Sequence, residues 1–203
     1  MMKIAKSLFG FVLFMVIAAS PVTGEDTHFA GQFKKGSDSF GLQVGLGYTE
    51  DLPSGLDRTD ITYLFFFPNY QYNLTGLMGS SWYQGAWNWH LEAGVASILN
   101  HDGEYLLGAS PLLFQYKFLD PKRRWAPNVL IGAGVSHTNW DEVADRELGG
   151  SFQFLLHGGV GLEYFLDNWS YSINYRMLHI SNAGTQNPNI GLNGHTFALG
   201  IQF

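Results

Sequence analysis

The sequence of 203 residues predicts an all-β fold, namely an eight-stranded antiparallel transmembrane β-barrel of the bacterial outer membrane. Apolar and polar residues alternate in segments of about ten residues, the pattern of a strand with one lipid-facing side. The chain ends on Phe203 after an alternating stretch that begins at His195, as the last strand of such a barrel does. The composition combines 25 glycines with 16% aromatic residues, which suits tight turns and aromatic girdles at a membrane interface.

Eight segments with a two-residue period follow one another along the chain. They cover residues 40–48, 59–72, 82–97, 105–118, 125–137, 152–165, 169–181 and 193–203. No helical period of useful length interrupts them, so the barrel is expected to consist of strands alone. Pro68 and Pro111 fall inside two of the segments, and proline cannot donate to a β-ladder. We therefore expect bulges or strand ends at these two positions.

The connections predict how the barrel is oriented. Residues 49–58, 138–151 and 182–192 form long polar connections, as external loops do, whereas the connections at 120–124 and 167–168 are short, as periplasmic turns are. The faces opposite the apolar ones carry Gly, Gln, Asn, His, Glu and Arg. This pattern predicts a polar lumen and a lipid-facing outer wall, whereas a soluble barrel has a charged exterior.

The N-terminal segment, residues 1–24, reads as a cleaved signal peptide that precedes a barrel domain at 25–203. Lys3 and Lys6 form a positive start, and an apolar run continues to Ala19. The run is shorter than the roughly 20 apolar residues that a membrane-spanning helix needs. We therefore expect export through this signal and localisation as a multi-pass protein of the bacterial outer membrane.

The charge balance and the absence of cysteine exclude some classes of partner and chemistry. The formal net charge is −6, and removal of the two N-terminal lysines makes the chain more acidic, which argues against a nucleic-acid ligand. With no cysteine, disulfides cannot stabilise the fold. No metal or cofactor is expected, because His90 with Glu92, and His157 with Glu163, are interpreted as parts of a hydrogen-bonded interior.

Strand parity predicts a functional site near the C-terminus. Trp169, Tyr171 and Ile173 share the lipid-facing side of the seventh segment, and the same count places His179 and Ser181 on that side. Because the seventh and eighth segments are neighbours, Asn193 is expected to join them on the outer wall. Polar groups that face lipid lose their hydration, so such residues mark function more often than structure.

These residue types suit hydrolysis by a nucleophilic serine. Ser181 needs a base within hydrogen-bond reach, and His179 projects beside it at i−2. The carbonyl of Asn193 would orient the imidazole. The oxyanion would be held by the amide of Asn182, or by backbone N–H groups at Ala183 and Gly184. The alternative is that His179 and Ser181 are inert residues at the level of the lipid headgroups.

At these residues the chain resembles the lipid A 3-O-deacylases of the PagL family. The resemblance rests on His179-Ile-Ser-Asn-Ala-Gly184, followed by Asn187-Pro-Asn-Ile-Gly-Leu192. It implies an eight-stranded outer-membrane barrel with its active site on the outer wall. It also implies Ser181 as the nucleophile, His179 as the base and a contribution of Asn182 to the oxyanion hole. The chain departs from the family pattern in one respect, because Asn193 stands where an acidic residue is expected.

The resemblance implies a carboxylic ester hydrolase that removes the acyl chain at the 3 position of lipid A, with lipopolysaccharide as its substrate. Two alternatives remain. One is a non-enzymatic eight-stranded barrel that serves adhesion or envelope integrity. The other is an acyltransferase barrel that binds phospholipid in its lumen, and the polar inward faces argue against it. The oligomeric state is open, with a homodimer as one alternative.

Overall fold

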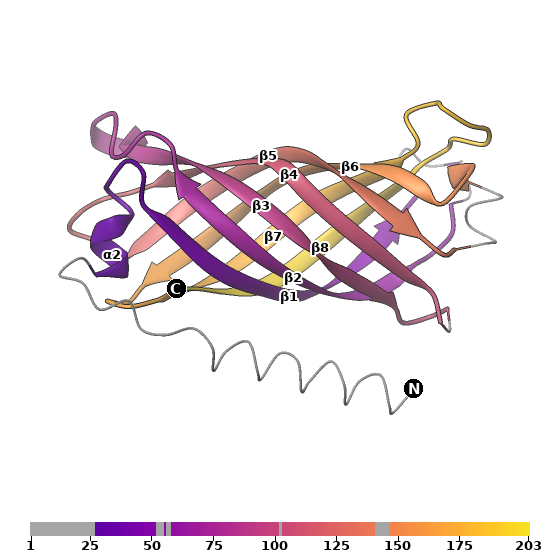
Figure 1. Ribbon diagram of the computed structural model, residues 1–203, viewed down its shortest axis with the longest axis horizontal. Coiled ribbons are helices and arrows are strands. Elements are labelled where there is room, and N and C mark those ends of the chain that lie inside the picture. Colours follow the sequence, from indigo (N-terminus) through magenta and orange to yellow (C-terminus); the bar gives the residue numbers. More distant parts are fainter. Residues whose placement is uncertain (1–26, 52–54, 56–57, 102, 141–146) are drawn as a thin grey trace.

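The chain forms a closed antiparallel β-barrel in a computed structural model that describes residues 27–51, 55, 58–101, 103–140 and 147–203 (Figure 1). Eight strands follow one another in chain order, and β1 closes the barrel by pairing with β8. They are β1 (Asp38–Glu50), β2 (Thr62–Asn73), β3 (Gly85–Ile98), β4 (Tyr105–Phe118), β5 (Trp125–Thr138), β6 (Phe152–Phe165), β7 (Ser170–Ser181) and β8 (Leu192–Gln202). The predicted fold class is confirmed. The predicted signal peptide at 1–24 lies outside the described residues.

The two ends of the barrel differ. The connections after β1, β3, β5 and β7 lie at one end, which we call the loop end. The other connections lie at the turn end, where the short helix α2 (His28–Gly31) and the chain end after β8 are also found (Figure 1). A single turn of 3-10 helix, η1 (Ser81–Tyr83), lies between β2 and β3. No helix in the described ranges is long and apolar enough to cross a membrane.

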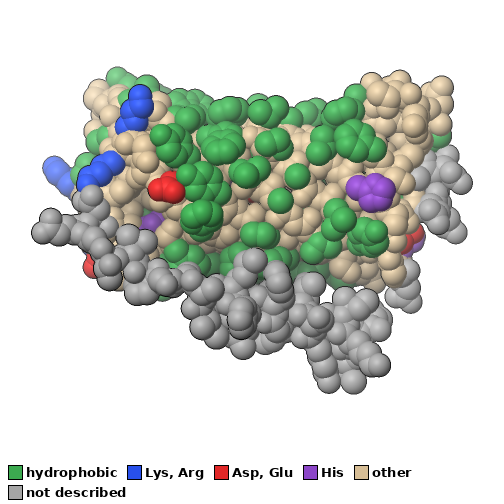
Figure 2. Space-filling model, in the orientation of Figure 1, with side chains coloured by type: hydrophobic (Ala, Val, Ile, Leu, Met, Phe, Trp, Pro, Cys, Tyr) green, Lys and Arg blue, Asp and Glu red, His purple; other side chains and the backbone are tan. Residues whose placement is uncertain are grey.

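The outer wall is apolar, as period-two alternation requires of a lipid-facing surface. Hydrophobic side chains are spread over the visible face of the barrel, and Lys and Arg gather at one end of it (Figure 2). Phe40 and Ile131 each expose 65% of their surface, and neither has a protein partner that would bury it. Exposed apolar area on this scale marks a surface that a membrane covers.

The two prolines behave differently. Pro111 lies where the register of β4 shifts against β5, between Ala109 and Leu112, so the predicted bulge is confirmed there. Pro68 keeps a regular pairing with Leu42 of β1, and the β2–β3 ladder resumes in the same register after it. The prediction of a bulge or strand end at Pro68 is therefore wrong. The missing N–H of one proline removes a ladder hydrogen bond but inserts no extra residue into the strand.

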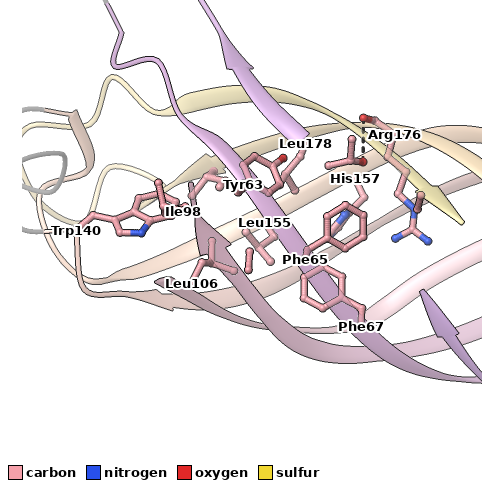
Figure 3. A pocket seen from close by; sticks show the side chains of 14 residues that line it. Tyr63, Phe65, Phe67, Ile98, Leu106, Trp140, Leu155, His157, Arg176 and Leu178 are labelled. Carbon is pink, nitrogen blue, oxygen red and sulfur yellow. Dashed lines mark hydrogen bonds between the residues drawn. The ribbon is translucent and has the colours of Figure 1, made fainter. Parts of the chain in front are cut away.

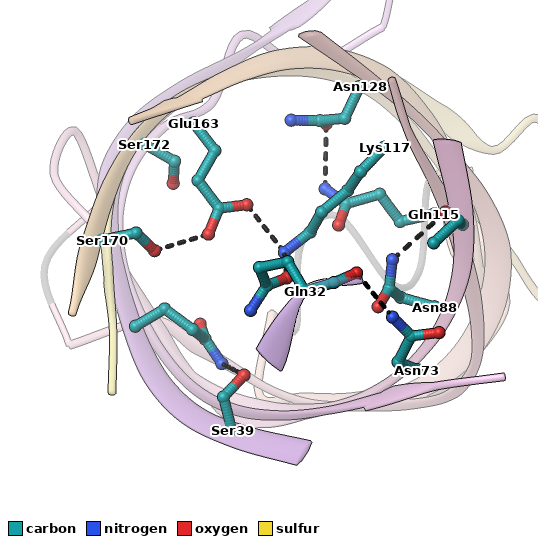
Figure 4. Close-up of polar contacts among 12 residues, drawn as sticks. Gln32, Ser39, Asn73, Asn88, Gln115, Lys117, Asn128, Glu163, Ser170 and Ser172 are labelled. Carbon is teal, nitrogen blue, oxygen red and sulfur yellow. Dashed lines mark hydrogen bonds and ion pairs between the residues drawn. The ribbon is translucent and has the colours of Figure 1, made fainter. Parts of the chain in front are cut away.

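Polar side chains fill the lumen at the turn end, as predicted. The ammonium of Lys117, which has no exposed surface, lies 2.7 Å from Glu163 and donates to Gln32 at 3.0 Å (Figure 4). Ser170 donates to the same Glu163 carboxylate and lies 3.2 Å from His28 of α2. Burial lowers the pKa of the His28 imidazole to about 4, so a neutral ring closes this end of the lumen.

A second buried ion pair lies further along the lumen. Arg176 of β7 donates to both carboxylate oxygens of Glu92 of β3, at 2.7 and 2.8 Å. Gln43 of β1 joins both partners, since its amide donates to Glu92 and its carbonyl accepts from Arg176. Both oxygens of Glu92 and both terminal nitrogens of Arg176 thus have partners, and such contacts are what make a buried ion pair tolerable.

The lumen at the loop end is apolar, which corrects the prediction of a polar interior throughout. A buried hydrophobic cluster there includes Tyr63, Phe65, Leu106, Leu155 and Ile180 (Figure 3). It lines a cavity of about 40 Å³. A space of this size has room for little more than one water, not for an acyl chain. The apolar interior that a phospholipid site needs is therefore partly present, but this cavity, lined by described residues, is too small for a phospholipid.

Candidate active site

The three residues that parity placed on the outer wall meet there. His179 of β7 is the register partner of Asn193 of β8, and Ser181 follows two residues further on β7. The ring nitrogen Nδ1 of His179 lies 2.6 Å from Oδ1 of Asn193. Because a carbonyl oxygen only accepts, Nδ1 carries a proton, and in the neutral ring Nε2 then keeps the lone pair. The contact thus favours the tautomer of the neutral ring that a general base requires.

Alternation fixes the direction of these side chains. Ile180, between His179 and Ser181, points into the apolar lumen and is buried, as is Leu192 beside Asn193. Because Ile180 and Leu192 point inward, the neighbouring polar side chains lie on the opposite, outward face of the same strands. A register slip by one residue would turn the whole site into the lumen.

Gly191 brings the end of the β7–β8 loop close to the site. A Cβ at this glycine would lie 3.0 Å from Cε1 of His179 and 3.3 Å from Cβ of Ser181. Its φ of +72° is also in the region that favours glycine. Arg58 is buried and donates to the Gly191 carbonyl at 2.8 Å, which fixes the position of this residue. Sequence analysis noted Gly191 only as part of the motif and missed Arg58.

Asn182 builds the loop that follows Ser181. Its side-chain amide is buried and donates to the carbonyls of Leu148 and Gln186, at 2.7 and 2.9 Å. Its carbonyl oxygen accepts from the backbone N–H of Gly184 at 2.8 Å. The oxyanion role of Asn182 and Gly184 stays a prediction. The side-chain amide of Asn182 and the backbone N–H of Gly184 both donate to acceptors within the protein in this structure.

Two groups beside the loop are open to a ligand. Within the described ranges, neither the hydroxyl of Ser181 nor the backbone N–H of Ala183 has a hydrogen-bond partner. Ala183 is exposed and has a positive φ of 55°. Contacts of a nucleophile are often loose before substrate binds, so an unpaired Ser181 is compatible with a role as nucleophile.

The wall on the β6 side of the site is apolar. Phe154 is the register partner of Ser181, and Leu156 is that of His179. One position further from the loop end on this face, Gly158 pairs with Met177. Gly158 faces outward, and a Cβ built on it meets nothing within 4 Å. The missing side chain leaves open space on the outer wall, diagonal to His179.

The wall on the β1 side of the site is polar. Glu50, the last residue of β1, is the register partner of Asn193 and accepts a hydrogen bond from Nε2 of His195. Nδ1 of His195 lies 2.7 Å from the hydroxyl of Tyr175. No local sequence pattern pointed to Glu50, because only the closing β1–β8 register brings it there. Across the described ranges, no group of three or more His, Cys, Asp or Glu could hold a metal ion.

These features define a class of protein. The chain is an outer-membrane β-barrel that carries a serine, a histidine and an orienting amide on its outer wall. The model of the lipid A 3-O-deacylase (PagL) family matches residues 58–202, and the chain belongs to this family. The resemblance of the C-terminal motif is therefore confirmed, and the predicted ester hydrolase is confirmed at the level of the family.

The chain is also similar to individual proteins. The chain is 29% identical over 133 residues to lipid A deacylase PagL of Pseudomonas aeruginosa, across 63% of this chain and 73% of that protein. The crystal structure of the outer membrane enzyme PagL matches with a TM-score of 0.58 and 21% identity, across 79% of this chain and 97% of that one. Neisserial surface protein A (NspA) matches with a TM-score of 0.49 and 13% identity, across 81% and 95%.

Proposed function

We propose that this protein is a serine esterase that hydrolyses the ester-linked acyl chain at the 3 position of lipid A. The observation that carries the proposal is the His179–Asn193 contact beside Ser181 on the lipid-facing wall. Membership of the lipid A 3-O-deacylase family supports the substrate. A site on the outer wall at the loop end would meet its substrate in the outer leaflet, with no need for the lipid to enter the lumen.

The proposed reaction follows from the state of the histidine. Nε2 of His179 takes the proton of Ser181 as the serine oxygen attacks the ester carbonyl. The resulting imidazolium then returns the proton to the departing sugar oxygen, which leaves an acyl group on Ser181. A water molecule, activated by the same nitrogen, releases the fatty acid and restores the serine. No other acid or base is needed.

The negative charge on the ester oxygen needs donors near Ser181. We assign the exposed N–H of Ala183 as one of them, because it has no partner among the described residues. The predicted donors Asn182 and Gly184 flank it, and they could contribute only if the loop released their present contacts. Backbone donors of this kind stabilise the intermediate most when they are fixed in advance.

Asn193 takes the place of the acid that the family pattern leads us to expect. Its carbonyl orients the imidazole, as in hydrolases that use a Cys-His-Asn arrangement. An amide stabilises the imidazolium less than a carboxylate does. The substitution therefore bears on the rate of the reaction and leaves its chemistry unchanged.

We place the acyl chain on the β6 side of the site, over Gly158, because this part of the outer wall is apolar. Gly158→Leu should fill the open space there and lower kcat/KM for long-chain esters by about tenfold, the scale of steric discrimination in apolar sites. Butanoyl esters end before they reach this position and should be hydrolysed as by the parent protein. Rates with butanoyl and tetradecanoyl esters in one detergent give the comparison.

A matched control is Ala93→Leu, which adds the same side chain to the outer wall on β3, away from the site. It should leave both rates unchanged. Equal losses for short and long esters in Gly158→Leu would mean that the substitution disturbs the barrel, and no loss would mean that the acyl chain lies elsewhere.

The orientation belongs to the same proposal, with the loop end outside the cell and export through a signal peptide cleaved after residue 24. Because the chain has no cysteine, single cysteines can report the topology without background. Gly55→Cys and Gly103→Cys should react with an impermeant maleimide on intact cells, since a Cβ at either glycine meets nothing within 4 Å. Lys122→Cys, in the β4–β5 turn, should react only after lysis. Labelling of Lys122→Cys on intact cells would contradict this orientation and indicate the opposite one.

The proposed function is tested by mass spectrometry of lipid A after incubation with the purified protein. The expected product has lost one hydroxyacyl chain, together with release of the free fatty acid. Unchanged lipid A from several lipopolysaccharides, with a protein that is folded by its heat-modifiable mobility, would favour the non-enzymatic barrel instead.

A further inference from the structure

A chain of three polar side chains crosses the outer wall next to the site. Nε2 of His195 donates to the carboxylate of Glu50, and Nδ1 of the same ring contacts the hydroxyl of Tyr175. The ring also lies against the rings of Tyr175 and Tyr48, at centroid distances of 5.9 and 5.2 Å. Residues from β1, β7 and β8 thus hold one carboxylate in a fixed place on a surface that otherwise faces lipid.

The cluster of Glu50, His195 and Tyr175 contains one acidic group, the carboxylate of Glu50. A carboxylate only accepts, so Nε2 of His195 carries the proton of this contact. The negative charge of the cluster is that of the Glu50 carboxylate.

This charge lies beside the residue that breaks the family pattern. Glu50, Asn193 and His179 are successive register partners across β1, β8 and β7, and all three face outward. Two strand spacings separate the backbones of Glu50 and His179, about 10 Å. No side chain on the other flank offers a charge, because Leu156 is the β6 partner of His179.

We propose that Glu50 supplies, from the neighbouring strand, the negative charge that the site lacks at position 193. Glu50 is a positioning residue, which does not touch the reacting atoms but stabilises the His179 imidazolium formed during attack. The inference rests on the proposed function, since it concerns that step. At about 10 Å and an intermediate dielectric, with screening by salt, the expected effect on rate is about three- to tenfold.

A double-mutant cycle between Glu50→Gln and Asn193→Asp tests this role. In the parent protein, Glu50→Gln should lower kcat about three- to tenfold and leave KM unchanged. In the Asn193→Asp protein the imidazolium already has an adjacent carboxylate, so the same change should lower kcat less than about twofold. Glu104→Gln is the matched control, because Glu104 is another carboxylate near the loop end that pairs with a histidine, His101, and it lies beside β4. It should change neither constant.

The same double-mutant cycle can be measured without lipid A, from the rate at which Ser181 reacts with an alkyl phosphonate. If the parent protein does not deacylate lipid A, the proposed function fails, while the phosphonate rates still decide the role of Glu50. Equal losses in the two backgrounds would overturn the inference, because Glu50 would then act through the fold. A rise in KM with unchanged kcat would overturn it in favour of a contact with the sugar headgroup, and no effect would overturn it outright.

Discussion

Ser181→Ala is expected to lower the rate of lipid A deacylation by at least about a hundredfold, because the acyl-enzyme can no longer form. His179→Ala should lower it by a similar factor, since His179 is the base proposed to take the proton of Ser181. The two losses should not add in the double variant, because each removes the same step. Initial rates of fatty acid release in one detergent provide the measurement.

Ser97→Ala is the control for the loss of an outward-facing hydroxyl, since Ser97 lies on the outer wall of β3, away from the site. It should match the parent protein in rate and in heat-modifiable mobility. Activity retained in Ser181→Ala would contradict the serine mechanism, whatever the behaviour of His179→Ala.

Glu92→Ala should have the largest effect on stability, because it leaves the guanidinium of Arg176 buried without its carboxylate. Both side chains are almost fully buried, and each Glu92 oxygen accepts from a different nitrogen of Arg176. Removal of one partner of such a pair destabilises a protein by about 3–5 kcal/mol. Urea unfolding of the refolded barrel in detergent gives the change in the free energy of unfolding.

The double variant Glu92→Leu with Arg176→Met separates two causes of instability, namely an unpaired buried charge and the loss of the ion pair itself. It should be more stable than Glu92→Ala, because apolar side chains can replace a buried pair at little cost. An unfolding midpoint for Glu92→Ala equal to that of the parent protein would contradict this account of the lumen.

The strands were predictable because each carries a two-residue period of its own. The bounds of β4 and β6 match the sequence prediction, and the others lie within a few residues of it. The apolar half of the lumen was not predictable, since β2 is aromatic on both faces around Phe65 and alternation alone cannot say which face turns inward. The barrel register settles this, because it places Tyr63 and Phe65 opposite the inward glycines of β1.

The core of the candidate site was also predictable, because parity and one hairpin suffice to bring His179, Ser181 and Asn193 together. The contacts of Asn182 were not, because they depend on how the loop folds back over itself. Glu50 is more than a hundred residues away in the sequence and reaches the site only when β1 closes on β8. Local periodicity carries no information about either arrangement.

We propose Ser181, on the outer wall, as the nucleophile. Peptide mass spectrometry tests this role after reaction of the purified barrel with an alkyl phosphonate that modifies activated serines. One modified residue, Ser181, is expected, with loss of the modification in His179→Ala. Modification of another serine, or an equal yield in His179→Ala, would contradict it.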